Sequence, residues 1–216
     1  MRVLIFGATG SAGGSVLRAC LASPAVDEVR TITRRAPRIE HEKLRPFIHA
    51  DFLDYSAVAG AFEGIDAVLF CLGVSSTQVS EDEYRRITHD FAIAAAKAMQ
   101  AGSPGAAFHF ISGTGTRADS RMMWSRVKAA TESELMALVG AICWRPAAID
   151  GVPSDSEPRI IKFLRPFYRL FKPFHGLYIS GNDLGRAMIQ ATAEGMRNRV
   201  LENAEMRTVA ERAVTA

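Results

Sequence analysis

The sequence predicts an α/β fold built on a doubly wound parallel sheet, and three observations indicate it. Short apolar runs alternate along the chain with stretches of helical periodicity, as in proteins whose parallel strands are joined by crossover helices. The first apolar run, over residues 2–6, leads into a glycine-rich turn and then into a helix. With 216 residues, of which 48% are hydrophobic, the chain suits one compact domain spanning 1–216.

The expected elements follow from these runs in chain order. Six short apolar runs predict strands at 2–6, 29–33, 46–49, 67–71, 107–111 and 141–144. Helical periodicity between them predicts helices at 15–22, 56–62, 82–101 and 125–139. A last strand at 200–202 and a short helix at 207–216 are expected near the C-terminus. No repeat or low-complexity linker interrupts the pattern.

The turn after the first strand contains glycines with the spacing G-x-x-G-x-x-G. One glycine permits the tight turn, another lets the backbone approach a pyrophosphate, and a third lets the helix pack closely on the strand. The helix N-terminus then directs free N–H groups at the phosphates. The residues predicted to bind a dinucleotide here are Gly7, Thr9, Gly10, Ser11, Ala12 and Gly13. A tight turn without a ligand is the alternative, whereas a P-loop is disfavoured because no Gly-Lys-Ser/Thr follows.

The end of the second strand indicates which dinucleotide is preferred. NAD-selective proteins place an acidic residue about twenty positions after the glycine turn, where it binds the ribose 2′-hydroxyl. This sequence has Arg34 and Arg35 there instead. Two guanidinium groups suit a 2′-phosphate, so NADP(H) is predicted in preference to NAD(H). The alternative is an ordinary solvated arginine pair.

These features resemble the atypical short-chain dehydrogenase/reductases, and within them the group of the HIV Tat-interacting oxidoreductase-like proteins. The resemblance extends over nearly the whole chain and implies a Rossmann fold. Beyond the glycine turn it rests on His49-Ala50-Asp51, Cys71-Leu72-Gly73, Ile111-Ser112-Gly113, Trp124-Ser125-Arg126-Val127-Lys128 and Arg145-Pro146. A late helix over 179–188, with Asn182 or Asp183 as its N-cap, also resembles the family.

The resemblance assigns further residues to the cofactor. It implies that Asp51 reaches the adenine amino group and that Gly73 lets the chain pass close to the cofactor. The additional cofactor-binding residues that it implies are Asp51, Phe52, Cys71, Leu72, Gly73 and Lys128. Taken alone, Asp51 equally suits a loop cap and Gly73 a turn.

Catalysis in this superfamily relies on Ser, Tyr and Lys, with Tyr and Lys four residues apart on one helix face. Ser112 and Lys128 occupy two of these positions, but Trp124 stands in place of the tyrosine. By resemblance, Lys128 holds the nicotinamide ribose and Ser112 orients a substrate carbonyl. An indole N–H donates a hydrogen bond and cannot act as an acid or base near neutral pH. The group that normally transfers the proton is therefore missing.

Three explanations of this substitution remain open. The protein reduces a small carbonyl substrate and takes the proton from water or another group. Candidate groups are Tyr84, Tyr168, Tyr178 and His175. Alternatively, it binds NADP(H) as a catalytically silent redox sensor or protein-interaction scaffold, or the helix register differs. Trp124 as a pocket-lining aromatic and Lys128 as a surface charge form the structural alternative.

The segment 151–182 is expected to cover the substrate pocket, and its part 159–174 is strongly amphipathic. Basic residues recur there every three or four positions, opposite an aromatic and aliphatic face. A pocket lid, an oligomer or protein interface and, less favoured, membrane contact are the alternatives. Pro166 and Pro173 argue against one long helix.

Composition excludes several other classes. A net charge of +3 without a basic-aromatic sheet motif gives no basis for nucleic-acid binding. Three scattered cysteines and five histidines have no metal-ligand spacing and predict neither a disulfide framework nor a metal site. No apolar stretch is long enough for a signal peptide or a membrane span, so a cytoplasmic location is expected.

Overall fold

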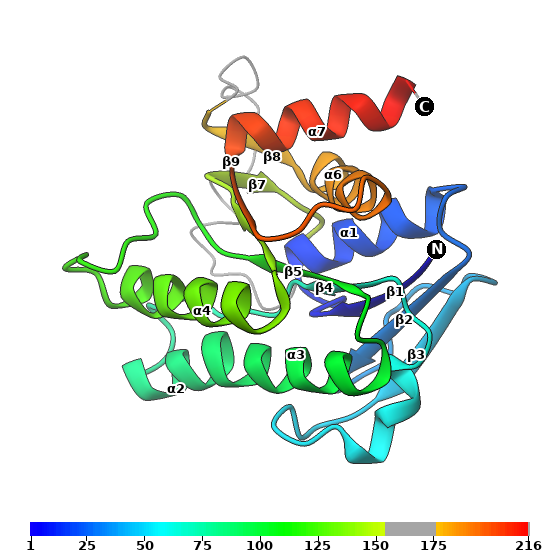
Figure 1. Ribbon diagram of the computed structural model, residues 1–216, viewed down its shortest axis with the longest axis horizontal. Coiled ribbons are helices and arrows are strands. Elements are labelled where there is room, and N and C mark those ends of the chain that lie inside the picture. The colour runs from blue at the N-terminus through cyan, green and yellow to red at the C-terminus, as the bar shows by residue number, and fades with distance from the viewer. Residues whose placement is uncertain (154–175, 216) are drawn as a thin grey trace.

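The computed structural model describes residues 1–153 and 176–215, and its centre is a seven-stranded parallel sheet (Figure 1). The strand order is β3-β2-β1-β4-β5-β6-β9, so the order reverses between β1 and β4. The strands are β1 Arg2–Phe6, β2 Glu28–Thr33, β3 Leu44–Ile48, β4 Ala67–Phe70, β5 Ala107–Ile111, β6 Ile142–Arg145 and β9 Arg199–Glu202. Because every pairing is parallel, all carboxyl ends meet at one edge of the sheet. Ligands bind at such an edge, beside the reversal point.

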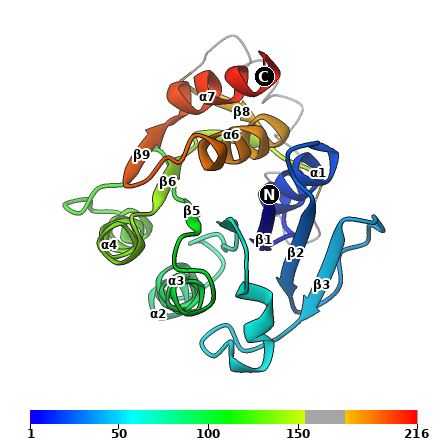
Figure 2. The same cartoon turned by 45° about the vertical axis from the view of Figure 1, so that its right-hand side comes forward.

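Helices cover both faces of the sheet (Figure 2). One layer consists of α1 Ser11–Ala22, α6 Gly181–Ala193 and α7 Asn203–Thr215. The other consists of η1 Ser56–Phe62, α2 Glu81–Arg85, the π-helical turn η2 Arg86–Asp90, α3 Phe91–Gly102 and α4 Met123–Val139. This doubly wound arrangement confirms the predicted fold class.

The core consists of two apolar clusters, one on each side of the sheet. Val3 and Ile5 of β1 point into the cluster under α1 and α6, whereas Leu4 and Phe6 point into the aromatic cluster on the opposite side. All four side chains are at most 1% exposed. A central parallel strand is buried on both faces, and its sequence is therefore continuously apolar rather than alternating.

The six earlier predicted strands all form, with ends shifted by at most two residues, because each is a local apolar run. The helix expected at 82–101 is instead divided into α2, η2 and α3. The expected N-cap of α6 was wrong: Ser180, not Asn182 or Asp183, caps this helix. Ser180 Oγ accepts from the Asp183 N–H at 3.0 Å and donates to the Asp183 carboxylate at 2.7 Å.

A small second sheet was not predicted. It pairs β7 Ala148–Asp150 with β8 Tyr178–Ser180 in parallel. The start of the expected pocket-covering segment lies against α1, since the Val152 N–H donates to Ser15 Oγ at 2.8 Å and a Cβ at Gly151 would lie 2.5 Å from Ser11 Oγ. The amphipathic part, 159–174, lies outside the described residues, as do Tyr168 and His175.

Helices α1 and α6 pack with little space between them. A Cβ at Gly185 would lie 2.5 Å from Ala19 Cβ and 3.2 Å from Val16 Cα. Gly185→Ala is therefore expected to reduce the free energy of unfolding by about 1–3 kcal/mol, because the added methyl group overpacks this contact. Urea unfolding measures the change. Gly105→Ala is the control, since a Cβ there meets nothing within 4 Å; equal midpoints for the two variants would contradict the prediction.

Candidate cofactor and catalytic site

The predicted glycine turn forms a bare backbone cradle at the end of β1. Gly7 has a φ of +74°, and a Cβ there would lie 2.6 Å from the Cys71 carbonyl oxygen and 2.7 Å from Leu72 N. A Cβ at Gly13 would collide with the Gly7 carbonyl oxygen. Glycine is required at both positions because backbone from three segments meets here. Cys71 and Leu72 thus form one wall of the turn.

The N-terminus of α1 opens from this turn without a side-chain cap. Gly10 occupies the N-cap position, and the first helical turn has no acidic residue. The N–H groups of a helix start lack partners within the helix and carry a partial positive charge. Thr9 is exposed and Ser11 and Ala12 are half-buried around this end. The arrangement fits a pyrophosphate.

The end of β2 lies next to the cradle, because Phe6 pairs with Ile32. Arg34 and Arg35 follow β2 and are both exposed, and within the described residues neither has an ion pair. The Thr33 hydroxyl beside them is buried without a hydrogen-bond partner. An unpartnered buried hydroxyl and two free guanidinium groups fit a polar, anionic ligand.

The residues after β3 and β4 offer mostly main-chain atoms to the predicted cofactor site. Asp51 is exposed and its Oδ1 accepts from the Leu53 N–H at 3.0 Å, so it does cap its own loop. The Phe52 side chain is 5% exposed and stacks on Phe91, which leaves only its main chain for a ligand. Gly73 is exposed, and a Cβ there would meet no protein atom.

The structure brings the three predicted catalytic residues together at the end of β5. Lys128 Nζ donates to the Ser112 carbonyl oxygen at 2.6 Å. A Cβ at Gly113 would lie 3.6 Å from Lys128 Nζ and 3.8 Å from Trp124 Cζ3. Lys128 and Trp124 are one helical turn apart on α4 and flank the backbone after Ser112.

The Ser112 hydroxyl is engaged within the protein. It is buried and lies 3.1 Å from Thr116 Oγ1, which in turn donates to the Gly113 carbonyl oxygen at 2.7 Å. Because Thr116 uses its proton on Gly113, Ser112 is the donor in the pair. Sequence reasoning missed Thr116, since nothing in the stretch Gly113-Thr114-Gly115-Thr116 distinguishes it from an ordinary loop residue.

Electrostatics around Lys128 favour loss of its charge. Burial lowers the pKa of Lys128 to about 8, and the Glu132 carboxylate one turn along α4 opposes this. Glu132 is itself neutralised by Arg145, whose guanidinium binds both carboxylate oxygens at 3.0 and 2.6 Å. The remaining attraction on the Lys128 ammonium is therefore weaker than a free carboxylate would give.

The other candidate proton donors are placed differently. Tyr178 donates its hydroxyl proton to Asp150 Oδ2 at 3.0 Å and is 5% exposed. Tyr84 is 3% exposed, and burial raises the pKa of its phenol. Tyr168 and His175 lie outside the described residues.

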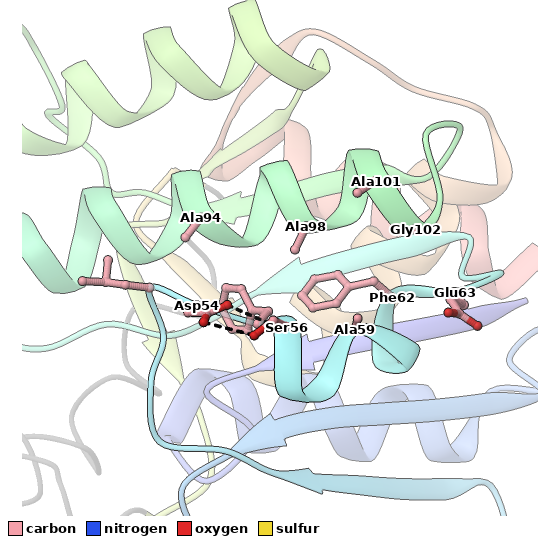
Figure 3. Close-up of a pocket in the computed structure, with 11 residues that line it drawn as sticks. Asp54, Ser56, Ala59, Phe62, Glu63, Ala94, Ala98, Ala101 and Gly102 are labelled. Atoms are coloured by element: carbon pink, nitrogen blue, oxygen red, sulfur yellow. Dashed lines mark hydrogen bonds between the residues drawn. The ribbon is translucent and has the colours of Figure 1, made fainter.

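Two surface hollows lie on the α3 side, away from the glycine cradle. One, of about 370 Å³, separates Ala94, Ala98 and Ala101 of α3 from Ala59 and Phe62 of η1 (Figure 3). The other, of about 390 Å³, is lined by Leu53, His89, Asp90, Ile93, Ala94 and Lys97. Neither hollow contains a residue of the predicted site.

Comparison with known proteins supports the assignment of an NAD(P)(H) site to this chain. A family described as NAD(P)H-binding matches residues 7–136. The "Protein FMP52, mitochondrial" of Chaetomium globosum is 30% identical over 176 residues, covering 78% of this chain and 76% of the relative. Protein HTATIP2 of Rattus norvegicus is 27% identical over 136 residues, covering 62% of this chain and 55% of that protein.

Solved structures show the same fold at low identity. An oxidoreductase of the short-chain dehydrogenase/reductase family from Burkholderia thailandensis superposes with a TM-score of 0.69 at 17% identity, covering 93% of this chain and 89% of that one. A UDP-N-acetylglucosamine 4-epimerase from Methanobrevibacter ruminantium gives 0.71 at 14%, covering 93% and 75%. Among the described helices, none has the length and apolarity needed to cross a bilayer. The chain belongs to the NAD(P)H-binding family and has the Rossmann fold.

Proposed function

We propose that this protein binds NADP(H) and uses it to reduce a small carbonyl compound. One observation carries the proposal: the phosphate cradle after β1 and the Ser112–Trp124–Lys128 cluster after β5 lie at the same carboxyl edge of one sheet. A cofactor held with its pyrophosphate at α1 would extend along this edge towards β5. Ligands of open α/β sheets bind in this position.

The preference for NADP(H) rests on Arg34 and Arg35. Both are exposed beside the cradle, and no described carboxylate pairs with them. A guanidinium binds a phosphate through charge-assisted hydrogen bonds, which contribute about 1.5–3 kcal/mol each. The ribose of NAD(H) lacks this phosphate and gains nothing comparable.

Replacing both arginines, as Arg34→Ser with Arg35→Ser, is expected to weaken NADPH binding at least tenfold and to change NADH binding little. Calorimetric titration with each nucleotide measures the two dissociation constants. Arg199→Ser is a control for charge, because this exposed residue begins β9 at the opposite edge of the sheet. Equal affinity of the unmodified protein for NADPH and NADH would refute the preference.

The chemistry requires two contributions. The bound reduced nicotinamide supplies a hydride to the carbonyl carbon, and the protein supplies a proton to the oxygen. Lys128 is positioned to hold the nicotinamide ribose, as the family resemblance implies, and its contact with the Ser112 carbonyl fixes the start of the loop after β5. The half-buried Trp124 lies beside the same loop, with its Cζ3 3.8 Å from the position of a Cβ at Gly113.

A second candidate function is a silent NADP(H) sensor or scaffold, and Trp124 is the observation that favours it. A panel of aldehydes and ketones distinguishes the two, with NADPH consumption as the measurement. Consumption of NADPH with any member of the panel supports the reductase. Tight NADPH binding with no consumption supports the sensor. A cytoplasmic location and an interface through 159–174 stay predictions.

A further inference from the structure

We propose that Lys128 itself donates the proton to the substrate oxygen, in place of the tyrosine for which Trp124 stands. This rests on the proposed reductase function and names the group that completes it.

Position singles out Lys128 among the described residues at the end of β5. Trp124 has only an indole N–H, which is not an acid near neutral pH. The Ser112 hydroxyl is buried, and its hydrogen bond is donated to Thr116 Oγ1. Lys128 Nζ lies 2.6 Å from the Ser112 carbonyl oxygen and beside Gly113. An ammonium has three protons, of which this hydrogen bond uses one.

The charges facing Lys128 leave its proton transferable. From α4, Glu132 faces it one turn along, and Arg145 of β6 binds that carboxylate. From the loop after β5, the neutral Ser112 carbonyl accepts a hydrogen bond from it. Arg145 also pairs with Glu202 of β9 at 3.2 Å. With its nearest carboxylate already paired, burial lowers the pKa of the Lys128 ammonium to about 8. This value is close to neutral pH, and an acid transfers protons most effectively when its pKa lies near the operating pH.

The step balances without another reactant. The hydride from the reduced nicotinamide forms a C–H bond at the carbonyl carbon while the C=O π bond breaks towards oxygen. One N–H bond of the Lys128 ammonium breaks as the O–H bond of the alcohol forms. The products are the alcohol, the oxidised nucleotide and a neutral amine, which regains its proton from water.

Lys128→Arg separates proton donation from cofactor binding. Arginine keeps the positive charge and the hydrogen-bond donors, but it does not release a proton in proteins. We expect Lys128→Arg to bind NADPH within about tenfold of the unmodified protein and to lose at least 100-fold in kcat, the usual contribution of an acid catalyst. The probe substrate is 4-nitrobenzaldehyde, and Lys97→Arg on the exposed side of α3 is the matched control.

A second measurement does not depend on turnover. The chain has five lysines, Lys43, Lys97, Lys128, Lys162 and Lys172, so ¹³Cε-lysine NMR resolves them individually. One signal is expected to titrate near pH 8 with NADP⁺ bound and to be missing in Lys128→Arg. In turnover, kcat/KM should fall above this pH, because reduction requires the ammonium.

The outcomes are distinguishable. Turnover by Lys128→Arg within tenfold of the unmodified protein, or titration of Lys128 near the ordinary lysine pKa of about 10.4, overturns the donor role alone. Failure to bind NADPH overturns the proposed function. NADPH binding without turnover of any member of the aldehyde and ketone panel by the unmodified protein overturns both the reduction and the donor role.

Discussion

Lowering the pH from 7 to 5 is expected to remove about 2 kcal/mol of unfolding free energy through His109 alone. This histidine of β5 is fully buried between Trp144 and Thr192. Trp144 Nε1 donates to His109 Nδ1 at 3.1 Å, so the ring proton is on Nε2 and is donated to Thr192 Oγ1 at 2.9 Å. The Thr192 hydroxyl in turn donates a hydrogen bond to the Met188 carbonyl oxygen. A second ring proton has no place in this chain of hydrogen bonds.

The sign follows from the two protonation equilibria. Burial, aided by the positive charge of Arg197, lowers the pKa of His109 to about 3 in the folded protein. The unfolded chain has the ordinary histidine pKa of about 6.5 and so binds the proton first. The unfolding free energy is therefore unaffected by the titration of His109 above the unfolded-state pKa of about 6.5, and it falls as the pH drops through that value. Between pH 7 and 5 the folded residue stays neutral, so the loss depends only on the unfolded pKa.

Urea unfolding of the unmodified protein and of His109→Gln at pH 7 and pH 5 measures this effect. His109→Gln is expected to be less stable than the unmodified protein at pH 7. Because glutamine does not titrate, the unfolding free energy of the variant falls by about 2 kcal/mol less between pH 7 and pH 5. His41→Gln is the control, because His41 is exposed. If the unfolding free energies of the unmodified protein and of His109→Gln show the same pH dependence, the prediction that buried His109 stays neutral is refuted.

This network shows where sequence reasoning stops. The strand at 107–111 was predictable because its apolar run is local. The partners of His109 are not, because Trp144 and Thr192 are 35 and 83 residues away in the chain. A lone histidine in an apolar strand has no sequence signal for the groups it meets. The same holds for the β7–β8 pair, whose strands of three residues are too short to show periodicity.

In the candidate site, too, some residues could be predicted from the sequence and others could not. The glycine turn was predictable because its requirement is for backbone space, and spacing alone expresses it. Ser112 and Lys128 came from a family resemblance, and the structure brings them into contact. Thr116 was not predicted because its role is to accept a hydrogen bond from Ser112 and to donate one to the Gly113 carbonyl oxygen. Such directional hydrogen bonds depend on loop geometry, which the sequence does not specify.

Replacing Glu132 by glutamine is expected to reduce the unfolding free energy by about 2–4 kcal/mol, because it removes the main partner of a partly buried guanidinium. Glu132 is 4% exposed and binds Arg145 through both oxygens. The loss is limited because Arg145 keeps its contact with Glu202. Urea unfolding at pH 7 measures it. Glu202→Gln is the matched control and is expected to cost less than about 1 kcal/mol, since its carboxylate is half-exposed.

The same substitution also tests how α4 connects fold stability with chemistry. The Glu132 carboxylate raises the pKa of Lys128 against the effect of burial. Without that charge the ammonium loses its proton more easily, so the lysine titration in Glu132→Gln is expected to move to lower pH. If Lys128 donates the proton, the alkaline fall in turnover moves in the same direction, whereas Glu202→Gln leaves both in place. An unchanged titration in Glu132→Gln would show that Arg145 screens the carboxylate completely, and the two roles of this helix would then be independent.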